Sequence, residues 1–162
     1  MVWSRDVTSC ALSQQVSIRL LTEAHVMAMS AIESIVQQVP WTEGQLRDSV
    51  VSDRVWGLFQ ADVLIGYSVM ILVVDEAQLL NMSIAKNYQT QGWGRVLLDF
   101  VLNDALAAGA TAVFLEVRES NRIALQLYRV MGFAPVGLRK GYYAAQPERE
   151  AAVLRRKVFK GV

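Results

Sequence analysis

Cysteine and histidine are almost missing from this 162-residue sequence, since each occurs once, as Cys10 and His25. A single cysteine cannot form an internal disulfide, which fits a reducing compartment. One cysteine and one histidine also provide no cluster of metal ligands, so we expect no metal. The sequence therefore excludes a disulfide-stapled scaffold and gives no support to a metalloenzyme.

Long apolar runs and an excess of charge of one sign are missing too. The longest mostly apolar run, Tyr67 to Val74, is too short to cross a bilayer, so we expect no membrane association. Residues 1–15 carry no signal-peptide pattern. The formal net charge of +1 gives no reason to expect direct contact with nucleic acid. Because 53% of the residues are hydrophobic, we expect a globular domain. The single cysteine and the missing signal-peptide pattern favour a cytoplasmic location.

Apolar spacing in the first half of the chain predicts both strands and helices. Residues 16–20 alternate as in a half-buried strand. Thr22 can cap a following helix that Pro40 ends, and the segment 42–45 is typical of a capping box that starts a second helix. The buried face of the first helix is expected to comprise Val26, Met29, Ile32, Ile35 and Val36. Residues 55–60 and 63–74 then predict a hairpin around Ala61-Asp62, and residues 78–84 predict a further strand.

The second half of the chain alternates between helical and strand patterns. Residues 96–106 fit a helical stripe that Gly109 is placed to end. Ser120 or Asn121 can cap another helix that runs to Met131. The predicted strands are 113–117, 133–138 and 151–158. An antiparallel first half followed by crossovers predicts an α/β fold with a mixed sheet.

The segment Gln89-Thr90-Gln91-Gly92-Trp93-Gly94-Arg95 is the most informative about function. It lies between a predicted strand and an amphipathic helix, where glycines let a ligand approach and free N–H groups can bind phosphate oxygens. The alternative is a glycine-rich turn without a ligand, because a short glycine pattern is weak evidence. Leu97 stands where a dinucleotide fingerprint needs a small residue, and no Gly-Lys-Ser or Gly-Lys-Thr triplet occurs. The loop therefore predicts an anion site, but not one for NAD or ATP.

Gln-x-x-Gly-x-Gly after a strand resembles the acetyl-CoA pyrophosphate loop of the GNAT acetyltransferase superfamily. Further segments, in the same order, are similar to bacterial ribosomal-protein-alanine N-acetyltransferases of the RimI type: 39–43, 74–77, Asn81, 88–95, 115–118, 120–121, 127–128, 132–133, Arg139 and 142–143. The resemblance runs from about Ile18 to Val158. It implies one acetyltransferase domain over 18–160, preceded by a flexible N-terminal extension over 1–17.

The resemblance also implies the fold and the co-substrate. The fold is a mixed central sheet of about six to seven strands, splayed at a cofactor cleft, with about four flanking helices. Acetyl-CoA is the implied co-substrate, and its proposed contacts are the backbone of Met82, Ser83 and Ile84, the loop Thr90, Gln91, Gly92, Trp93, Gly94 and Arg95, and the side chain of Asn121. Thr90 and Trp93 depart from the family pattern, in which a basic residue and a smaller apolar residue are common.

Glu116 and Tyr128 are the candidate catalytic residues. Alternation along 113–117 places Glu116 opposite the apolar face, near the strand end where ligands bind in open α/β sheets. Taken alone, Glu116 beside Arg118 is more typical of a solvated or ion-paired carboxylate, and Tyr128 of a core tyrosine. The resemblance implies instead that Glu116 takes a proton from the incoming amine and that Tyr128 gives one to the departing thiolate.

The implied reaction is acetyl transfer to the α-amine of an N-terminal alanine, in small-subunit ribosomal protein eighteen. An α-amine has a pKa of roughly 7.7–8.0 against about 10.4 for lysine, so a carboxylate acting through water can suffice. Trp41, Tyr142 and Tyr143 are candidate contacts to the substrate peptide, with simple packing as the alternative. Two other functions remain open: acetylation of lysine side chains or small amines, and non-catalytic binding of acyl-CoA.

Overall fold

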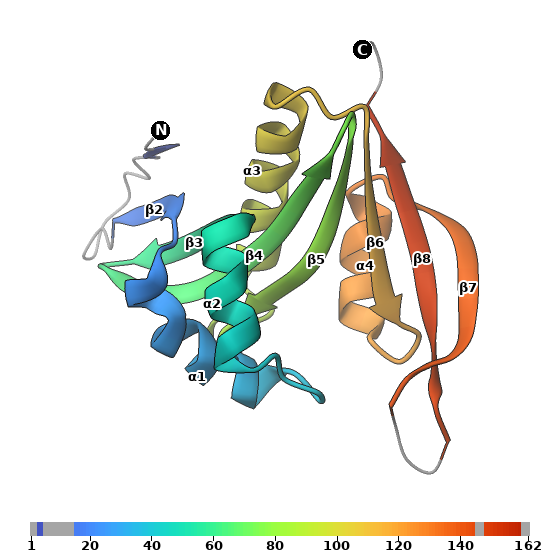
Figure 1. The fold of residues 1–162 in the computed structure, drawn as a ribbon, viewed down its shortest axis with the longest axis horizontal. Helices are drawn as coiled ribbons and strands as arrows, with labels where there is room; N and C mark the ends of the chain where they lie inside the picture. The colour runs from blue at the N-terminus through green and yellow to red at the C-terminus, as the bar shows by residue number, and fades with distance from the viewer. Residues whose placement is uncertain (1–2, 5–14, 145–147, 160–162) are drawn as a thin grey trace. The chain divides into compact units, whose positions relative to one another are not determined.

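The computed structural model describes residues 3–4, 15–144 and 148–159 (Figure 1). Of the predicted flexible extension over 1–17, residues 1–2 and 5–14 lie outside the described part, so its flexibility stays a prediction. Its residues Trp3–Ser4 form a short strand, β1, that pairs antiparallel with β2 (Val16–Leu20).

The chain separates into two compact units. The first unit comprises Met1–Val69 and Asn81–Leu98, and the second comprises Met70–Leu80 and Asp99–Val162. Three elements contribute residues to both units: β4 (Val63–Val73), β5 (Glu76–Ile84) and helix α3 (Trp93–Ala107).

Strands of the first unit follow the order β1-β2-β3-β4-β5, with β3 formed by Arg54–Gln60. The strands β2 and β3 pair antiparallel, from Val16 opposite Gln60 to Leu20 opposite Trp56. The predicted hairpin between β3 and β4 is present, and its turn residues Ala61 and Asp62 have φ of 45° and 64°. Two successive positive φ angles match the twist that a two-residue hairpin requires.

Helices of the first unit begin where their capping residues predict. A short 3₁₀ helix, η1 (Glu23–His25), follows Thr22, whose backbone N–H donates to Nδ1 of His25 at 3.1 Å. The helix α1 (Val26–Val36) continues from it and ends before Pro40. The helix α2 (Glu43–Ser52) starts at the predicted capping box, in which Gln45 N–H donates to Thr42 Oγ1 at 3.2 Å.

The buried face of α1 differs from the predicted face at one position. Val26, Met29 and Ile32 are buried as expected, but Ile35 is 66% exposed. Glu33, by contrast, is only 1% exposed. Glu33 follows Met29 by one helical turn, so the helix brings its side chain and not that of Ile35 back to the core.

The second unit contains β6 (Ala112–Arg118), α4 (Arg122–Val130), β7 (Ala134–Tyr143) and β8 (Glu150–Val158). Its strands follow the order β4-β5-β6-β8-β7. The β5–β6 ladder is parallel and runs from Glu76 opposite Ala112 to Leu79 opposite Leu115. The strands β6 and β8 pair antiparallel along the whole of β6, and β7 pairs with the outer edge of β8. This mixed sheet with flanking helices confirms the predicted fold class.

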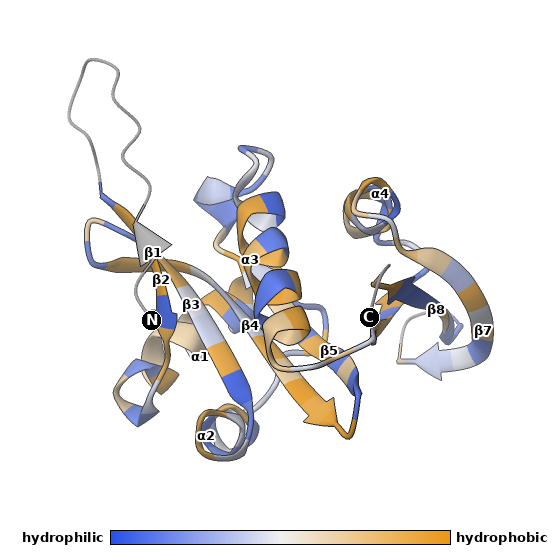
Figure 2. Cartoon of the chain, turned by 90° about the horizontal axis from the view of Figure 1, so that it is seen from above, coloured by the Kyte–Doolittle hydropathy of each residue, from blue (hydrophilic) through white to orange (hydrophobic). Residues whose placement is uncertain are grey.

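Apolar side chains form the core of each unit. In the first unit, a cluster includes Val26, Met29, Leu46, Phe59 and Tyr67. In the second unit, the fully buried side chains include Val101, Ala105, Val113 and Ala152. Figure 2 shows the corresponding pattern on α3, where hydrophobic and hydrophilic residues occupy different sides of the helix. Among the described residues, no helix is long and apolar enough to cross a membrane.

Candidate functional site

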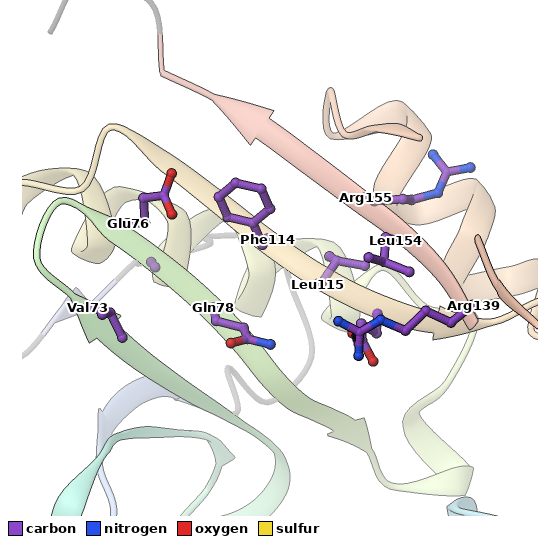
Figure 3. A pocket seen from close by; sticks show the side chains of 10 residues that line it. Val73, Glu76, Gln78, Phe114, Leu115, Arg139, Leu154 and Arg155 are labelled. Carbon is purple, nitrogen blue, oxygen red and sulfur yellow. Dashed lines mark ion pairs between the residues drawn. The ribbon is translucent and has the colours of Figure 1, made fainter. Parts of the chain in front are cut away.

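The second unit contains a cavity of about 260 Å³ (Figure 3). Glu116 is one of the residues that line it. Leu115 and Val117 are buried, while the Glu116 side chain, on the opposite face of β6, is 18% exposed. Its Oε1 lies 3.0 Å from Nη1 of Arg139, which comes from β7. Further residues of β4, β5, β6 and β8 line this Glu116 cavity, among them Val73, Gln78, Phe114, Leu154 and Arg155. A partly exposed carboxylate at a cavity wall has the position that a general base needs.

Tyr128 is held in the core of the second unit by α4. It is 7% exposed, and its ring meets that of Phe133 edge to face with the centroids 5.6 Å apart. Burial, with a smaller contribution from nearby Tyr143, raises the pKa of Tyr128 to about 12. The phenol is protonated at neutral pH, as an ordinary tyrosine is, and burial makes it a weaker acid.

Tyr143 provides the electrostatic link between the two candidate catalytic residues. Its pKa is raised, first by burial and then by the charge of Glu116, and it contributes in turn to the raised pKa of Tyr128. The guanidinium carbon of Arg118 lies 4.2 Å from the centre of the Tyr143 ring. Tyr142 meets Tyr143 edge to face at 5.0 Å. The second unit thus brings Glu116, Tyr128 and the tyrosine pair into one electrostatic environment.

An ion pair fixes the strand end beside these tyrosines. Nη1 of Arg118 lies 3.5 Å from Oε2 of Glu150, and both side chains are largely buried. The other carboxylate oxygen of Glu150 accepts a hydrogen bond from the backbone N–H of Ser120. Hydrogen bonding from Ser120, followed by Arg118, holds the pKa of Glu150 below its usual range. The sequence analysis did not identify Glu150, because no local pattern shows that residue 150 lies opposite residue 118.

Asn121 caps the helix that carries Tyr128. Its Oδ1 accepts a hydrogen bond from the backbone N–H of Ala124 at 3.1 Å. The side-chain oxygen is therefore used in the cap, and the amide nitrogen is the group that remains for a cofactor contact. The structure therefore shows Asn121 as the capping residue of α4, while its contact with a cofactor stays a prediction.

The loop before α3 lies in the first unit and has the backbone geometry of an anion site. Thr90 and Gly92 have φ of 59° and 88°, and the Gly92 carbonyl accepts from the N–H groups of Arg95 and Val96 at 3.1 Å. The N–H groups of Arg95 and Val96 are therefore used within the helix. Those of Trp93 and Gly94 precede them at the helix start, where N–H groups have no intrahelical acceptor and can bind an anion. A Cβ placed on Gly92 would meet no atom within 4 Å, so there is open space above the loop.

Two side chains brace this loop against the segments that precede it. Nε2 of Gln89 donates to the carbonyl of Ile84 at 2.9 Å, at the end of β5. Nε2 of Gln91 donates to the carbonyl of Asn87 at 2.8 Å. The first bond ties the predicted pyrophosphate loop directly to the predicted pantetheine-binding strand.

Behind that end of β5 is a buried polar cluster that the sequence analysis missed. We call Glu33, Gln37, Tyr67, Asn81 and Ser83 the Glu33 cluster. Asn81 Nδ2 and Ser83 Oγ donate to the Glu33 carboxylate at 3.0 and 3.2 Å, and the Tyr67 hydroxyl donates to it as well. Burial and then the charge of Glu33 raise the pKa of Tyr67 well above its usual range.

Trp41 is connected to the same cluster. Its backbone N–H donates to Oε1 of Glu33 at 3.1 Å, and its partly buried side chain packs against the apolar core of the first unit. The structure therefore gives Trp41 a packing role, while its contact with substrate stays a prediction. Within the described residues, no group of three or more potential metal ligands occurs.

Comparisons with known proteins show which family this chain resembles. Residues 24–133 match the acetyltransferase (GNAT) family. The [ribosomal protein bS18]-alanine N-acetyltransferase of Haemophilus ducreyi is 32% identical over 85% of this chain and 96% of its own length. The crystal structure of the ribosomal-protein-S18-alanine N-acetyltransferase from Escherichia coli has a TM-score of 0.86 and 28% identity, covering 91% of this chain and 96% of the other. Arabidopsis thaliana NAA60 in complex with acetyl-CoA shares the fold at 15% identity, with a TM-score of 0.80 over 90% of this chain and 99% of its own.

Proposed function

The chain belongs to the GNAT acetyltransferase family, and on that premise we propose that it acetylates the α-amine of an N-terminal alanine. The acceptor we propose is the ribosomal protein specified in the names of its relatives, so the enzyme works in the cytoplasm. The observation that carries the proposal is the Glu116 carboxylate at the wall of a cavity, within the part of the chain that the family covers.

Acetyl-CoA, which GNAT acetyltransferases use, supplies the acetyl group as an activated thioester. The loop at the start of α3 fits its phosphates, because the free N–H groups and the open space above Gly92 provide an anion site. We assign the phosphates to Thr90–Arg95, the pantetheine arm to the backbone of Met82–Ile84 and a further contact to Asn121. The early end of the β5–β6 ladder, at Leu79, supports this role for the end of β5.

Glu116 acts as the general base in this proposal. An N-terminal ammonium has a pKa of roughly 7.7–8.0 and must lose a proton before its nitrogen can attack. Glu116 takes that proton, directly or through a water molecule. A base of this kind contributes roughly 10²–10⁴-fold to a rate.

Tyr128 faces the departing sulfur in this proposal. A free thiol has a pKa of about 8.5, so complete proton transfer from a phenol with a pKa of about 12 is uphill. We therefore expect Tyr128 to act mainly by donating a hydrogen bond to the sulfur as the carbon–sulfur bond breaks. Tyr142, Tyr143 and Trp41 are the proposed contacts to the acceptor peptide.

The experiment that tests the function measures CoA release from acetyl-CoA with three matched peptides. One begins with free Ala-Arg-Tyr, the second is the same peptide with a blocked N-terminus, and the third is a blocked peptide that contains lysine. We expect turnover with the free peptide only. Turnover with the lysine peptide would instead establish side-chain acetylation, and acetyl-CoA binding without turnover would establish a non-catalytic binding module.

A further inference from the structure

The ion pair between Glu116 and Arg139 joins two strands that are not neighbours in the sheet. The strand β8 lies between β6 and β7, and on it Leu154 pairs with Glu116 while Ala152 pairs with Arg139. Strands two places apart are roughly 9–10 Å from each other, so the Arg139 side chain must extend across β8 to reach the carboxylate. Figure 3 shows this side chain reaching over the cavity from β7.

The two partners differ in exposure. The Arg139 side chain is 53% exposed, whereas that of Glu116 is 18% exposed. Arg139 is therefore the partner that is more accessible to solvent. An amine that approaches Glu116 from solvent arrives as an ammonium ion, with the same charge as the group already there.

We propose that Arg139 is a positioning residue: it holds the Glu116 carboxylate in place until the ammonium group of the substrate takes over the ion pair. This inference rests on the proposed function. Displacement is feasible because an ion pair with an exposed partner contributes little to stability. Arg139 also has another place to rest, since its guanidinium carbon already lies 5.4 Å from the centre of the Tyr142 ring.

Displacement has a consequence for specificity. A substrate end that carries one positive charge can replace the guanidinium, whereas a neutral end of the same shape leaves Arg139 in place. The Glu116 carboxylate thus selects for an unblocked amine before any chemistry takes place, and Arg139 lowers that preference because it competes with the ammonium group. Removing Arg139 would leave Glu116 without its resting partner, so an ammonium would bind with less competition.

The test compares two ligands on the full chain saturated with CoA. One is the peptide with a free N-terminal alanine, and the other is its desamino analogue, in which a propionyl group replaces that alanine. Calorimetry gives the ratio of the two dissociation constants for wild type, Arg139→Gln, Arg139→Lys and the matched control Lys140→Gln. The control removes one positive charge from the next residue of the same strand.

We expect Arg139→Gln to raise the preference for the free amine by about two- to fivefold, the range that an ion pair with an exposed partner supports. The KM for the free peptide should fall in parallel. Arg139→Lys should stay near wild type, and Lys140→Gln should not change the preference. In Glu116→Gln/Arg139→Gln the gain should disappear, because it depends on the carboxylate.

A purely structural role for Arg139 would weaken both ligands equally and leave their ratio unchanged, which would overturn the proposal. A gain of the same size in Lys140→Gln would overturn it as well, by showing a general charge effect. If Arg139→Gln does not fold, Arg139→Met, which also removes the charge, takes its place: a raised preference for the free amine supports the proposal and an unchanged one overturns it. Failure of the proposed function is a separate result, since wild type would then release no CoA with the free N-terminal peptide.

Discussion

Glu33 and Glu116 are two carboxylates withdrawn from water in opposite ways. Glu33, in the first unit, is 1% exposed and accepts hydrogen bonds from Trp41, Tyr67, Asn81 and Ser83. Glu116, in the second unit, is 18% exposed, faces an arginine and lines a cavity. A carboxylate whose oxygens are occupied by fixed neutral donors serves the structure. One with a displaceable cation and open space beside it is available for chemistry.

Among the substitutions that test this contrast, Glu116→Gln should have the largest effect on turnover. The amide cannot take a proton from the amine, so turnover should fall about 10²–10⁴-fold. Acetyl-CoA binding, measured by calorimetry, and the urea midpoint should both remain near wild type. Undiminished turnover would contradict the role of Glu116 as base.

Glu33→Ala should lower the stability of the protein, whereas Glu116→Gln should lower its turnover. The substitution leaves several buried donors without an acceptor, so the free energy of unfolding should fall by about 3 kcal/mol. Urea unfolding measures the loss, and Glu33→Gln, which keeps one acceptor oxygen, serves as the milder control. If Glu33→Ala unfolds like wild type, the cluster does not stabilise the first unit.

Tyr128→Phe tests a residue that combines burial with a proposed chemical role. A thiolate is already a good leaving group, so we expect turnover to fall by only about 10- to 100-fold, less than for Glu116→Gln. Tyr67→Phe is the matched control, since it removes the hydroxyl that binds Glu33. It should alter stability more than turnover per folded molecule, and equal losses of turnover in both variants would contradict the assignment of Tyr128.

Alkaline pH should weaken the folded state gradually. Tyrosine in the unfolded chain ionises near pH 10, whereas the pKa of folded Tyr128 is about 12. Between these values the unfolded state binds fewer protons, so stability falls as pH rises, by about 1.4 kcal/mol per unit. The contribution is complete below pH 10 and lost by pH 12.

This pH dependence can be measured by urea unfolding at intervals from pH 9 to pH 12. Tyr128→Phe should show a shallower decline than wild type across that range. Identical slopes would mean that the hydroxyl of Tyr128 is not protected from ionisation in the folded protein.

Local patterns in the sequence predict most elements of the fold, because capping and alternation depend on near neighbours. The start of α2 at Thr42 and the turn at Ala61-Asp62 are examples. Glu33 was missed because a charged residue is ordinarily assigned to solvent. Its position four residues after Met29, on the buried stripe, was the available signal.

The candidate site was predictable only in part. Alternation placed Glu116 on the face of β6 opposite the apolar residues, and the resemblance supplied its role, which the experiments above test. Its pairing with Arg139 was not predictable, because it depends on how β7 and β8 are aligned and β8 lies between the partners. Strand β7 also continues to Tyr143, beyond the predicted end at residue 138, because alternation becomes irregular where the pairing with β8 shifts.

The Glu33 cluster has a consequence for how the chain folds. The donors to Glu33 lie 8, 34, 48 and 50 residues away, so the carboxylate stays unsatisfied until strands β4 and β5 have docked on α1. Asn81 and Ser83 share one face of β5, and a slip of that strand by one residue would present Leu80, Met82 and Ile84 to the charge instead. A folding intermediate with β5 in the wrong register would therefore be destabilised, because it would bury a carboxylate that lacks hydrogen bonds. The buried Glu33 carboxylate therefore favours the correct register of β5, the strand on which we place the cofactor.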